Sequence, residues 1–309
     1  MLNAEPHPLD FDWRFDEPTI SKLCGLLRGR NVLALGAPSV ARRIEASGGQ
    51  VLLVDRQPVQ DVRSQLVADV LTPDVPEGNF DIAIVDAPWY PRELIDWASA
   101  GGRGVRCGGE VLMSVWPPET RPGAADDFAR AAAELGAWAG VTMLPIELVY
   151  EAPPFELIAC SISENGPLAR GPRYGHLVRL DLRLRPPAAR YPARPTLWHR
   201  FFLDGYQLAV RLGASGAAQS LVAPHPDAKG WLWPYVSARA PGRDRIGIWS
   251  SSGEVALVSD PRHLISVLQE AIRAGSTSAL EVALAAAPEL ISWKIPRPPY
   301  RRVLEWQHP

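Results

Sequence analysis

The first half of the chain alternates short apolar runs with stretches of helical spacing. Apolar runs that end near glycine or aspartate predict buried strands at 31–35, 51–54, 66–68, 80–85 and 110–116. Helical spacing between and after them predicts helices at 38–48, 91–100 and 124–135. Two more strands are expected at 141–150 and 155–162. This order predicts an α/β fold with a doubly wound, mostly parallel, Rossmann-like sheet.

The second half changes to a pattern of short strands and turns. Strict alternation over 176–185 predicts a half-buried antiparallel strand, and Asp204-Gly205 predicts a hairpin that joins 198–203 to 206–212. Further strands are expected at 231–237, 245–250 and 254–258, and helices at 261–274 and 277–287. We therefore expect a second, smaller α+β domain. The alternating aromatic segment 10–15 is either a packed edge strand or a cover over the ligand pocket.

Charge supports a division of the 309 residues into domains 1–165 and 166–309. The first stretch holds 13 basic and 24 acidic side chains, whereas the second holds 19 and 10. Two interpretations remain open. The halves either contact different partners or attract each other.

Several protein classes are disfavoured by the composition. Three widely spaced cysteines argue against a disulfide scaffold and against a zinc site, so no metal is expected. No apolar run approaches the ~18 residues of a membrane span. The acidic, aromatic start is unlike a signal peptide, so a cytoplasmic location is expected.

Four residues at predicted strand ends indicate a ligand site, namely Gly36, Asp55, Asp69 and Asp86. A glycine followed about 20 residues later by an acid is typical of nucleoside binding. Pro38 stands where a dinucleotide fingerprint needs glycine, which disfavours NAD and FAD. S-adenosylmethionine (SAM) has no phosphate, and its cationic sulfonium suits a carboxylate-rich edge.

The order of these motifs over residues 30–162 resembles that of class I SAM-dependent methyltransferases. The resemblance implies SAM as the cofactor, with Gly36 at its methionine part, Asp55 at the ribose and Asp69 near the adenine. It extends the cofactor site to the neighbouring residues Ala37, Pro38, Arg56 and Val70. The strands at 141–150 and 155–162 resemble the closing hairpin of that family.

Asp86-Ala-Pro-Trp89 is similar to the (Asp/Asn)-Pro-Pro-aromatic motif of enzymes that methylate amino nitrogens. A carboxylate can accept the N–H protons of an amine, proline fixes the backbone, and an aromatic ring can stack on a planar base. The predicted catalytic residues are therefore Asp86, Pro88 and Trp89. The alternative interpretation is an ordinary turn between a strand and a helix, with a packing tryptophan.

The predicted substrate-binding residues are Tyr90, Trp116, Arg179 and Arg183. Trp116 either lines the substrate pocket or packs in the core. Arginines interleaved with aromatic residues over 170–200 suit phosphate contact and base stacking, so the acceptor is a small molecule or a nucleic acid held by the basic second domain. The alternative is a solvated or docked basic surface.

Two other functions remain open. Aminopropyltransferases of the polyamine type share this fold and a similar Asp-Pro-Pro motif, and the acidic first half would attract a polyamine. However, the turn Gly36-Ala-Pro-Ser39 contains no acid, unlike the aspartate-rich turn of that group. The third possibility is a methyltransferase-like binding module that has lost turnover.

Overall fold

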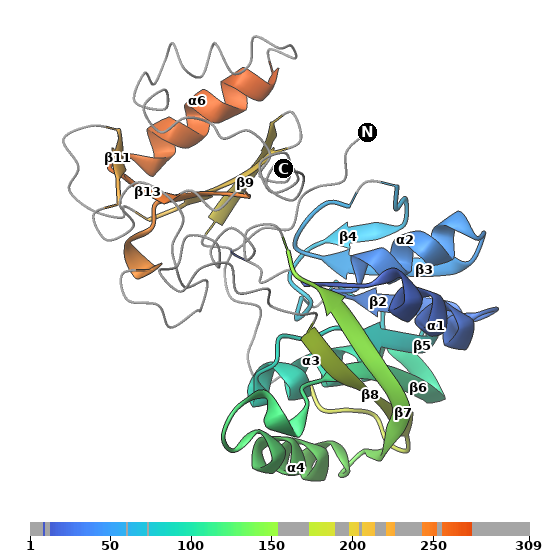
Figure 1. The fold of residues 1–309 in the computed structure, drawn as a ribbon. Helices are drawn as coiled ribbons and strands as arrows, with labels where there is room; N and C mark the ends of the chain where they lie inside the picture. The colour runs from blue at the N-terminus through green and yellow to red at the C-terminus, as the bar shows by residue number, and fades with distance from the viewer. Residues whose placement is uncertain are drawn as a thin grey trace, which may run out of the picture. The chain divides into compact units, whose positions relative to one another are not determined.

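The computed structural model describes residues 9, 13–59, 61–72, 74–153, 173–188, 198–203, 206–213, 221–225, 243–251 and 255–273. The chain divides into two compact units (Figure 1). One unit comprises 14–151 and 172–194, and the other comprises 1–13, 152–171 and 195–309.

The first unit is built on an eight-stranded sheet. In their spatial order, the strands are β1 (Arg14–Phe15), β7 (Ala139–Glu151), β8 (Arg173–Leu182), β6 (Val105–Val115), β5 (Phe80–Val85), β2 (Asn31–Leu35), β3 (Gln50–Asp55) and β4 (Gln65–Val67). The five strands from β6 to β4 are parallel, whereas β8 is antiparallel to both of its neighbours. The predicted doubly wound, mostly parallel sheet is therefore confirmed.

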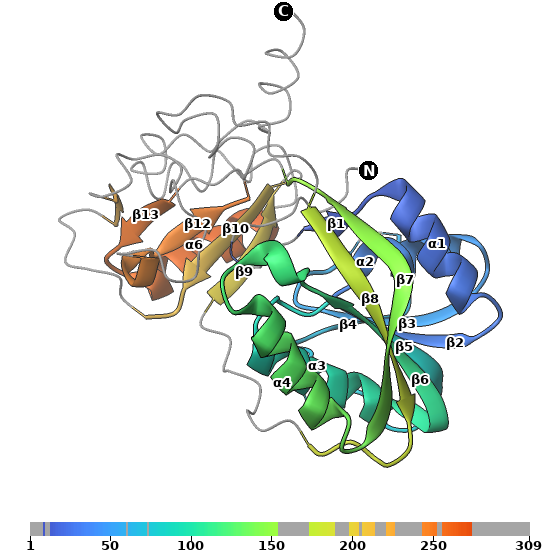
Figure 2. The ribbon, with the colours of Figure 1, turned by 60° about the horizontal axis from the view of Figure 1, so that its bottom comes forward.

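Helices cover both faces of this sheet, as Figure 2 shows. They are α1 (Glu17–Leu27), α2 (Pro38–Ala46), α3 (Pro91–Gly104) and α4 (Ala124–Leu135), with a short 3-10 turn η1 (Pro118–Thr120). The pair α1 and α2 lies on one face, and the pair α3 and α4 on the other. Coverage on both faces explains why central strands such as β2 are continuous apolar runs, with Val32 to Leu35 fully buried.

Helix α1 is the main element of this unit that the hydrophobic pattern did not predict. The side chain of Asp16 caps it by accepting the backbone N–H of Thr19 at 2.8 Å, and Pro18 occupies its first turn. Ile20 and Leu23 are buried on its inner side. The aspartate and proline together were a usable helix-start signal.

The predicted bounds agree closely for β5 and α4, but β6 begins five residues earlier than expected. The predicted start at Glu110 assumed that Gly108-Gly109 forms a turn before the strand. Instead, the two glycines lie inside the strand, at a shift in the pairing register with β5. Gly108 has φ +75°, a conformation that glycine adopts without strain. The glycines therefore mark a bulge rather than a boundary.

The strand predicted at 176–185 exists as the antiparallel strand β8, but its assignment to the second domain is wrong. It pairs with β6 from Glu110 to Val115 and with β7 along most of its length. Among the described residues, β7 pairs with β8. The segment 155–162, which the resemblance implied as the partner, lies outside the described residues. Alternation indicates that one face of a strand is buried, but not which sheet buries it.

The second unit contains a five-stranded antiparallel sheet covered by one described helix. The strands, in spatial order, are β11 (Val222–Pro224), β13 (Val255–Val258), β12 (Ile248–Ser250), β10 (Tyr206–Arg211) and β9 (Trp198–Leu203). Helix α6 (Pro261–Arg273) buries Leu264, Val267 and Leu268 against this sheet. A short 3-10 turn, η3 (Arg243–Arg245), precedes β12. The predicted β9–β10 hairpin and the α+β class are confirmed.

Three predicted elements lie outside the described residues, namely the strands at 155–162 and 231–237 and the helix at 277–287. In the segments that are described, no helix is long and apolar enough to cross a membrane.

Candidate functional site

The predicted ligand edge is formed by the carboxyl ends of the parallel strands β4, β3, β2, β5 and β6. Backbone hydrogen bonds join neighbouring strands where they end: Gly36 N donates to Val54 O, and Asp86 N donates to Leu35 O, each over 3.0 Å. The turns after β2 and β5 are therefore adjacent, as the fold class requires.

Gly36 forms a tight cradle at this edge. Its φ is +64°, and a side chain there would place its Cβ 2.6 Å from the Trp97 ring and 3.1 Å from the carbonyl oxygen of Asp86. The next two residues, Ala37 and Pro38, are buried. Of these three predicted cofactor residues, Gly36 is the one whose backbone reaches the surface of the edge.

Asp55 is held in a fixed orientation at the end of β3. Its Oδ1 accepts the backbone N–H of Gln57 at 2.9 Å, which closes a local turn. Its backbone carbonyl accepts the N–H of Ala68, so the loops after β3 and β4 are tied together. Asp55 is half-buried, at the position where the sequence predicts a ribose contact.

Asp69 has two partners of its own. Its Oδ1 accepts the backbone N–H of Leu71 at 3.0 Å, and its Oδ2 forms an ion pair with Arg56 at 2.5 Å. The predicted cofactor residues Arg56 and Asp69 therefore contact each other across the two loops. Val70 is 2% exposed and packs in the core, so it offers little surface to a ligand.

Asp86 stands at the centre of a hydrogen-bonded cluster that we call the Asp86 cluster (Asp86, Ser114 and Tyr150). Ser114 Oγ donates to Asp86 Oδ1 over 2.5 Å, and Tyr150 Oη donates to the same oxygen over 2.7 Å. Two donors on one oxygen suit the ionised carboxylate, which only accepts hydrogen bonds. Because Ser114 and Tyr150 are buried on β6 and β7, the carboxylate is held in one orientation.

Aromatic rings surround the phenol of this cluster. Trp89 meets Tyr150 edge to face, with ring centroids 5.6 Å apart, and the tilted ring of Phe15 on β1 packs against Tyr150 with centroids 4.6 Å apart. Gly175 of β8 leaves room for both rings, since a Cβ there would lie 3.1 Å from Trp89 and 3.3 Å from Tyr150. Trp89 is half-buried, so part of its ring is accessible beside Asp86.

The turn that carries Asp86 is rigid. Tyr90 N donates to Pro88 O over 2.7 Å, and Tyr90 O then accepts from Leu94 as α3 begins. Proline fixes its own φ, so few backbone rotations remain free between β5 and α3. The predicted residues Pro88, Trp89 and Tyr90 are thus all at the edge, each partly accessible.

Burial raises the pKa of the Tyr150 phenol well above its ordinary value, and the Asp86 carboxylate adds to the rise. Hydrogen bonding to Ser114 and Trp89 acts in the opposite direction. Tyrosine in an unfolded chain titrates near 10. The neutral phenol therefore stabilises the fold fully below about pH 10, and this stabilisation is lost as the pH rises further.

Replacing Tyr150 with phenylalanine should lower the free energy of unfolding by about 1.5–3 kcal/mol at pH 7, because a buried hydrogen bond to a charged group is lost. It should also flatten the loss of stability above pH 10. Urea denaturation at pH 7 and above pH 10 measures the free energy of unfolding of both proteins. Tyr174→Phe is the matched control, because Tyr174 is 47% exposed on β8. Equal stability of the two variants at pH 7 would contradict the prediction.

Three residues of this site were not predicted from the sequence, namely Ser114, Tyr150 and Gly175. Ser114 had a detectable signal, since it is a hydroxyl in the otherwise apolar end of β6. Tyr150 and Gly175 come from strands whose pairing was not predicted. Phe15 was noted as part of an edge strand or a cover, and the edge strand is confirmed by its pairing with Tyr150.

Trp116 packs in the core rather than lining the edge. It is 2% exposed, its indole N–H donates to Ala124 O over 2.9 Å, and Phe128 meets its ring edge to face. Of the two interpretations, the structure therefore favours packing.

Arg179 and Arg183 are not brought together with Asp86. Because β8 is antiparallel to β6, its start lies beside Val115, whereas its end lies beside Glu110 at the opposite edge of the sheet. Arg179 pairs in register with Leu112, and Arg183 follows the end of the strand. Both arginines also belong to the first unit, which corrects their place in a basic second domain.

The order β4-β3-β2-β5-β6-β8-β7, with β8 antiparallel, gives the chain a class I SAM-dependent methyltransferase-like fold. No protein-family model matches the chain, and no curated protein matches its sequence.

Solved structures match it at low sequence identity. A mutein of the branched-chain polyamine synthase from Thermus thermophilus, in complex with N4-aminopropylspermidine and 5′-methylthioadenosine, has a TM-score of 0.50 and 17% identity, over 62% of this chain and 64% of that one. A 16S rRNA N2 methyltransferase from T. thermophilus, in complex with AdoMet and guanosine, has a TM-score of 0.36 and 15% identity, over 72% of this chain and 58% of that one. The 1,6-didemethyltoxoflavin N1-methyltransferase of Burkholderia thailandensis has a TM-score of 0.35 and 14% identity, over 54% of this chain and 77% of that one.

This chain therefore spans less than two thirds of the length of the polyamine synthase and of the rRNA enzyme. The match to the polyamine synthase, at 17% identity, shows only that the two chains share a fold.

Proposed function

We propose that this chain binds SAM and transfers its methyl group to an amino nitrogen. The observation that carries the proposal is the Asp86 cluster, which fixes a carboxylate beside a half-buried tryptophan, next to the Gly36 cradle. A parallel sheet binds its ligand at this edge. The acceptor and the cofactor would therefore meet where the turns after β2 and β5 adjoin.

The residues present fit SAM at two points. Gly36 is partly exposed at the edge. The Trp97 ring and the Asp86 carbonyl fill the space that a Cβ would take, so a ligand there would meet the glycine backbone beside the Trp97 ring. Asp55 offers an oriented carboxylate of the kind that binds ribose hydroxyls. When bound there, SAM would supply an electrophilic methyl group on a sulfonium.

The role proposed for Asp69 is narrower than the resemblance implied. Its carboxylate already holds Leu71 and Arg56, so it shapes the loop that would flank the adenine. The Arg56–Asp69 ion pair and the Asp55–Ala68 hydrogen bond together fix the distance between the two loops. We therefore propose that Arg56 and Asp69 position these two loops rather than contact the adenine directly.

The chain's own residues would orient the acceptor. Asp86 accepts an N–H of the amine, which turns the nitrogen lone pair towards the methyl group. Ser114 and Tyr150 keep the carboxylate from rotating away, so the orientation is set before the acceptor arrives. Trp89 provides a ring on which a planar acceptor can stack.

Asp55→Ala should weaken SAM binding by roughly 10- to 150-fold, because one hydrogen bond to a charged group contributes about 1.5–3 kcal/mol. Calorimetric titration with SAM and with S-adenosylhomocysteine measures this. Asp126→Ala, at an exposed position in the first turn of α4, is the control and should bind as the wild type does. A wild type that binds NAD but neither SAM nor its product would refute the proposal.

Aminopropyl transfer is the second candidate, because the polyamine synthase shares the fold at a TM-score of 0.50. The two functions differ in the cofactor that is consumed. Incubation with SAM and with decarboxylated SAM, followed by chromatography of the adenosine product, separates them. Turnover of the decarboxylated form alone would replace methyl transfer, and binding without any turnover would leave a non-catalytic binding module.

A further inference from the structure

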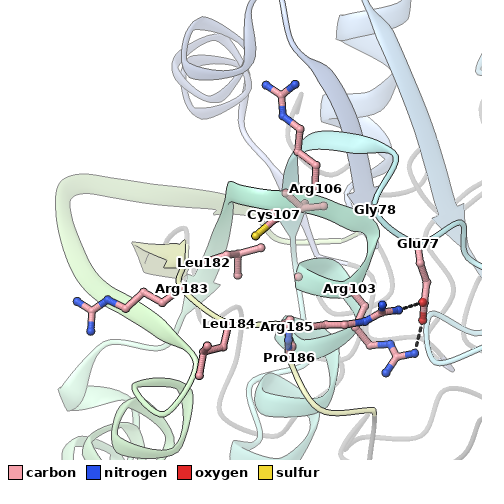
Figure 3. Close-up of a pocket in the computed structure, with 12 residues that line it drawn as sticks. Glu77, Gly78, Arg103, Arg106, Cys107, Leu182, Arg183, Leu184, Arg185 and Pro186 are labelled. Atoms are coloured by element: carbon pink, nitrogen blue, oxygen red, sulfur yellow. Dashed lines mark hydrogen bonds and ion pairs between the residues drawn. The ribbon is translucent and has the colours of Figure 1, made fainter.

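A cavity lies at the opposite edge of the sheet from Asp86. Its volume is about 340 Å³, which is within the range of small-molecule sites. It is lined by the loop before β5, the end of α3, the start of β6 and the segment that follows β8 (Figure 3). All these segments belong to the first unit, and none of the residues that line the cavity belongs to the Asp86 cluster.

The walls of this cavity are partly apolar. Val105 and Pro186 are buried, Leu182 is half-buried and Leu184 is 63% exposed. An exposed leucine beside a cavity offers apolar surface that a ligand can cover. A ligand with an apolar body therefore suits the walls.

One side of the cavity carries an excess of positive charge. The guanidinium groups of Arg103 and Arg185 both pair with the single carboxylate of Glu77, as Figure 3 shows. Each guanidinium has five N–H donors, so one carboxylate cannot satisfy both. The three side chains keep a net charge of +1. Arg106 and Arg183 also line the cavity, and Arg106 is paired with Asp81 over 3.3 Å.

The negative end of α3 does not cancel this charge. The carbonyl of Arg103 accepts the N–H of Gly78, and that of Gly104 accepts the N–H of Asn79. The terminal carbonyls that would repel an anion are therefore occupied by the loop that carries Glu77.

We propose that this cavity binds a small organic anion, whose carboxylate or similar group contacts Arg103 and Arg185 while its apolar body covers Leu182, Leu184 and Pro186. This site is separate from the proposed transfer reaction. A nucleic-acid backbone fits less well, because a concave apolar wall offers nothing to a phosphate chain. The proposal gives a role to arginines that the active site leaves unused.

The test uses 1-naphthoate and its neutral counterpart 1-naphthalenemethanol, titrated calorimetrically into the full chain. Arg185→Gln should weaken naphthoate binding about 10-fold, because a charged hydrogen-bond donor is lost while Arg103 still holds Glu77. Glu77→Gln should tighten binding about fivefold, because a competing carboxylate is removed. Arg28→Gln, an exposed arginine after α1, is the matched control and should bind as the wild type does.

Cys107 reports whether the ligand lies in this cavity. Its thiol is exposed and lines the cavity, so bound naphthoate should slow its alkylation by iodoacetamide. Cys24 is the internal reference, since burial raises its pKa and slows its reaction in every sample.

Three outcomes would overturn the proposal. The first is equal affinity for the neutral alcohol, and the second is binding without protection of Cys107. The third is weaker binding in both the Arg185 and Glu77 variants together with lower melting temperatures, which would mean that the ion pairs only hold the wall. Displacement of naphthoate by a single-stranded oligonucleotide at equal phosphate concentration would favour nucleic acid instead.

Discussion

Replacing Asp86 with asparagine should leave the chain folded and reduce methyl transfer by about 10²- to 10⁴-fold, the range for a lost proton-accepting group. The amide oxygen can still accept both hydroxyl protons from Ser114 and Tyr150, so the cluster persists. The amide nitrogen, however, donates where the carboxylate accepted, and it cannot take an N–H of the acceptor. Transfer of a radiolabelled methyl group from SAM to a panel of amines and nucleobases measures the effect.

SAM affinity is the control for this variant and should stay close to that of the wild type. Ser114→Ala is the matched comparison, because it removes one of the two donors and leaves the carboxylate; transfer should fall by about 10-fold. If Asp86→Asn and Trp89→Ala both transfer at the wild-type rate, the turn after β5 is an ordinary connection between a strand and a helix.

Gly36→Ala should lower the free energy of unfolding by about 2–5 kcal/mol and abolish SAM binding. Backbone strain in the left-handed region costs about 1–2 kcal/mol. The new Cβ must also displace the Trp97 ring, which it would otherwise approach to 2.6 Å, and such overpacking costs about 1–3 kcal/mol. Urea denaturation and calorimetric titration measure the two effects.

Gly48→Ala separates strain from crowding. Gly48 has φ +78°, and among the described residues none beyond its chain neighbours has an atom within 4 Å of the place that a Cβ would take. Its variant should therefore lose only the strain term and should still bind SAM. A Gly36 variant that is no less stable than the Gly48 variant, and that binds SAM, would show that the cradle is not needed.

The parallel core could be predicted because burial on both faces gives unbroken apolar runs. The bounds predicted for β5 are those observed, and Asp86 follows the strand directly, at the edge where we propose that the ligand binds. β8 could not be placed in the same way. Its alternation fits either sheet, and its position between β6 and β7 depends on pairing across long sequence separations.

The residues of the candidate site likewise fall into those that the sequence could place and those that it could not. Gly36, Asp55 and Asp86 follow parallel strands, so their common edge follows from the fold class. The partners of Asp86 come from β6 and β7, and the sequence holds no local signal that Tyr150 lies beside it. Arg183 was predicted at the substrate from the arginines and aromatic residues over 170–200, whereas the antiparallel direction of β8 places it at the other edge.

The place of β8 has a consequence for how the first unit is made. Strands β6 and β7 do not pair with each other, since each pairs with β8, which follows them in the chain. Domains tend to fold as they are synthesised, from the N-terminus onwards. A nascent chain that has reached Glu151 therefore presents the open edge of β6, and such edges invite pairing with other chains. A gene fragment that ends at residue 165 cannot yield this unit, because it lacks β8, the strand that pairs with both β6 and β7.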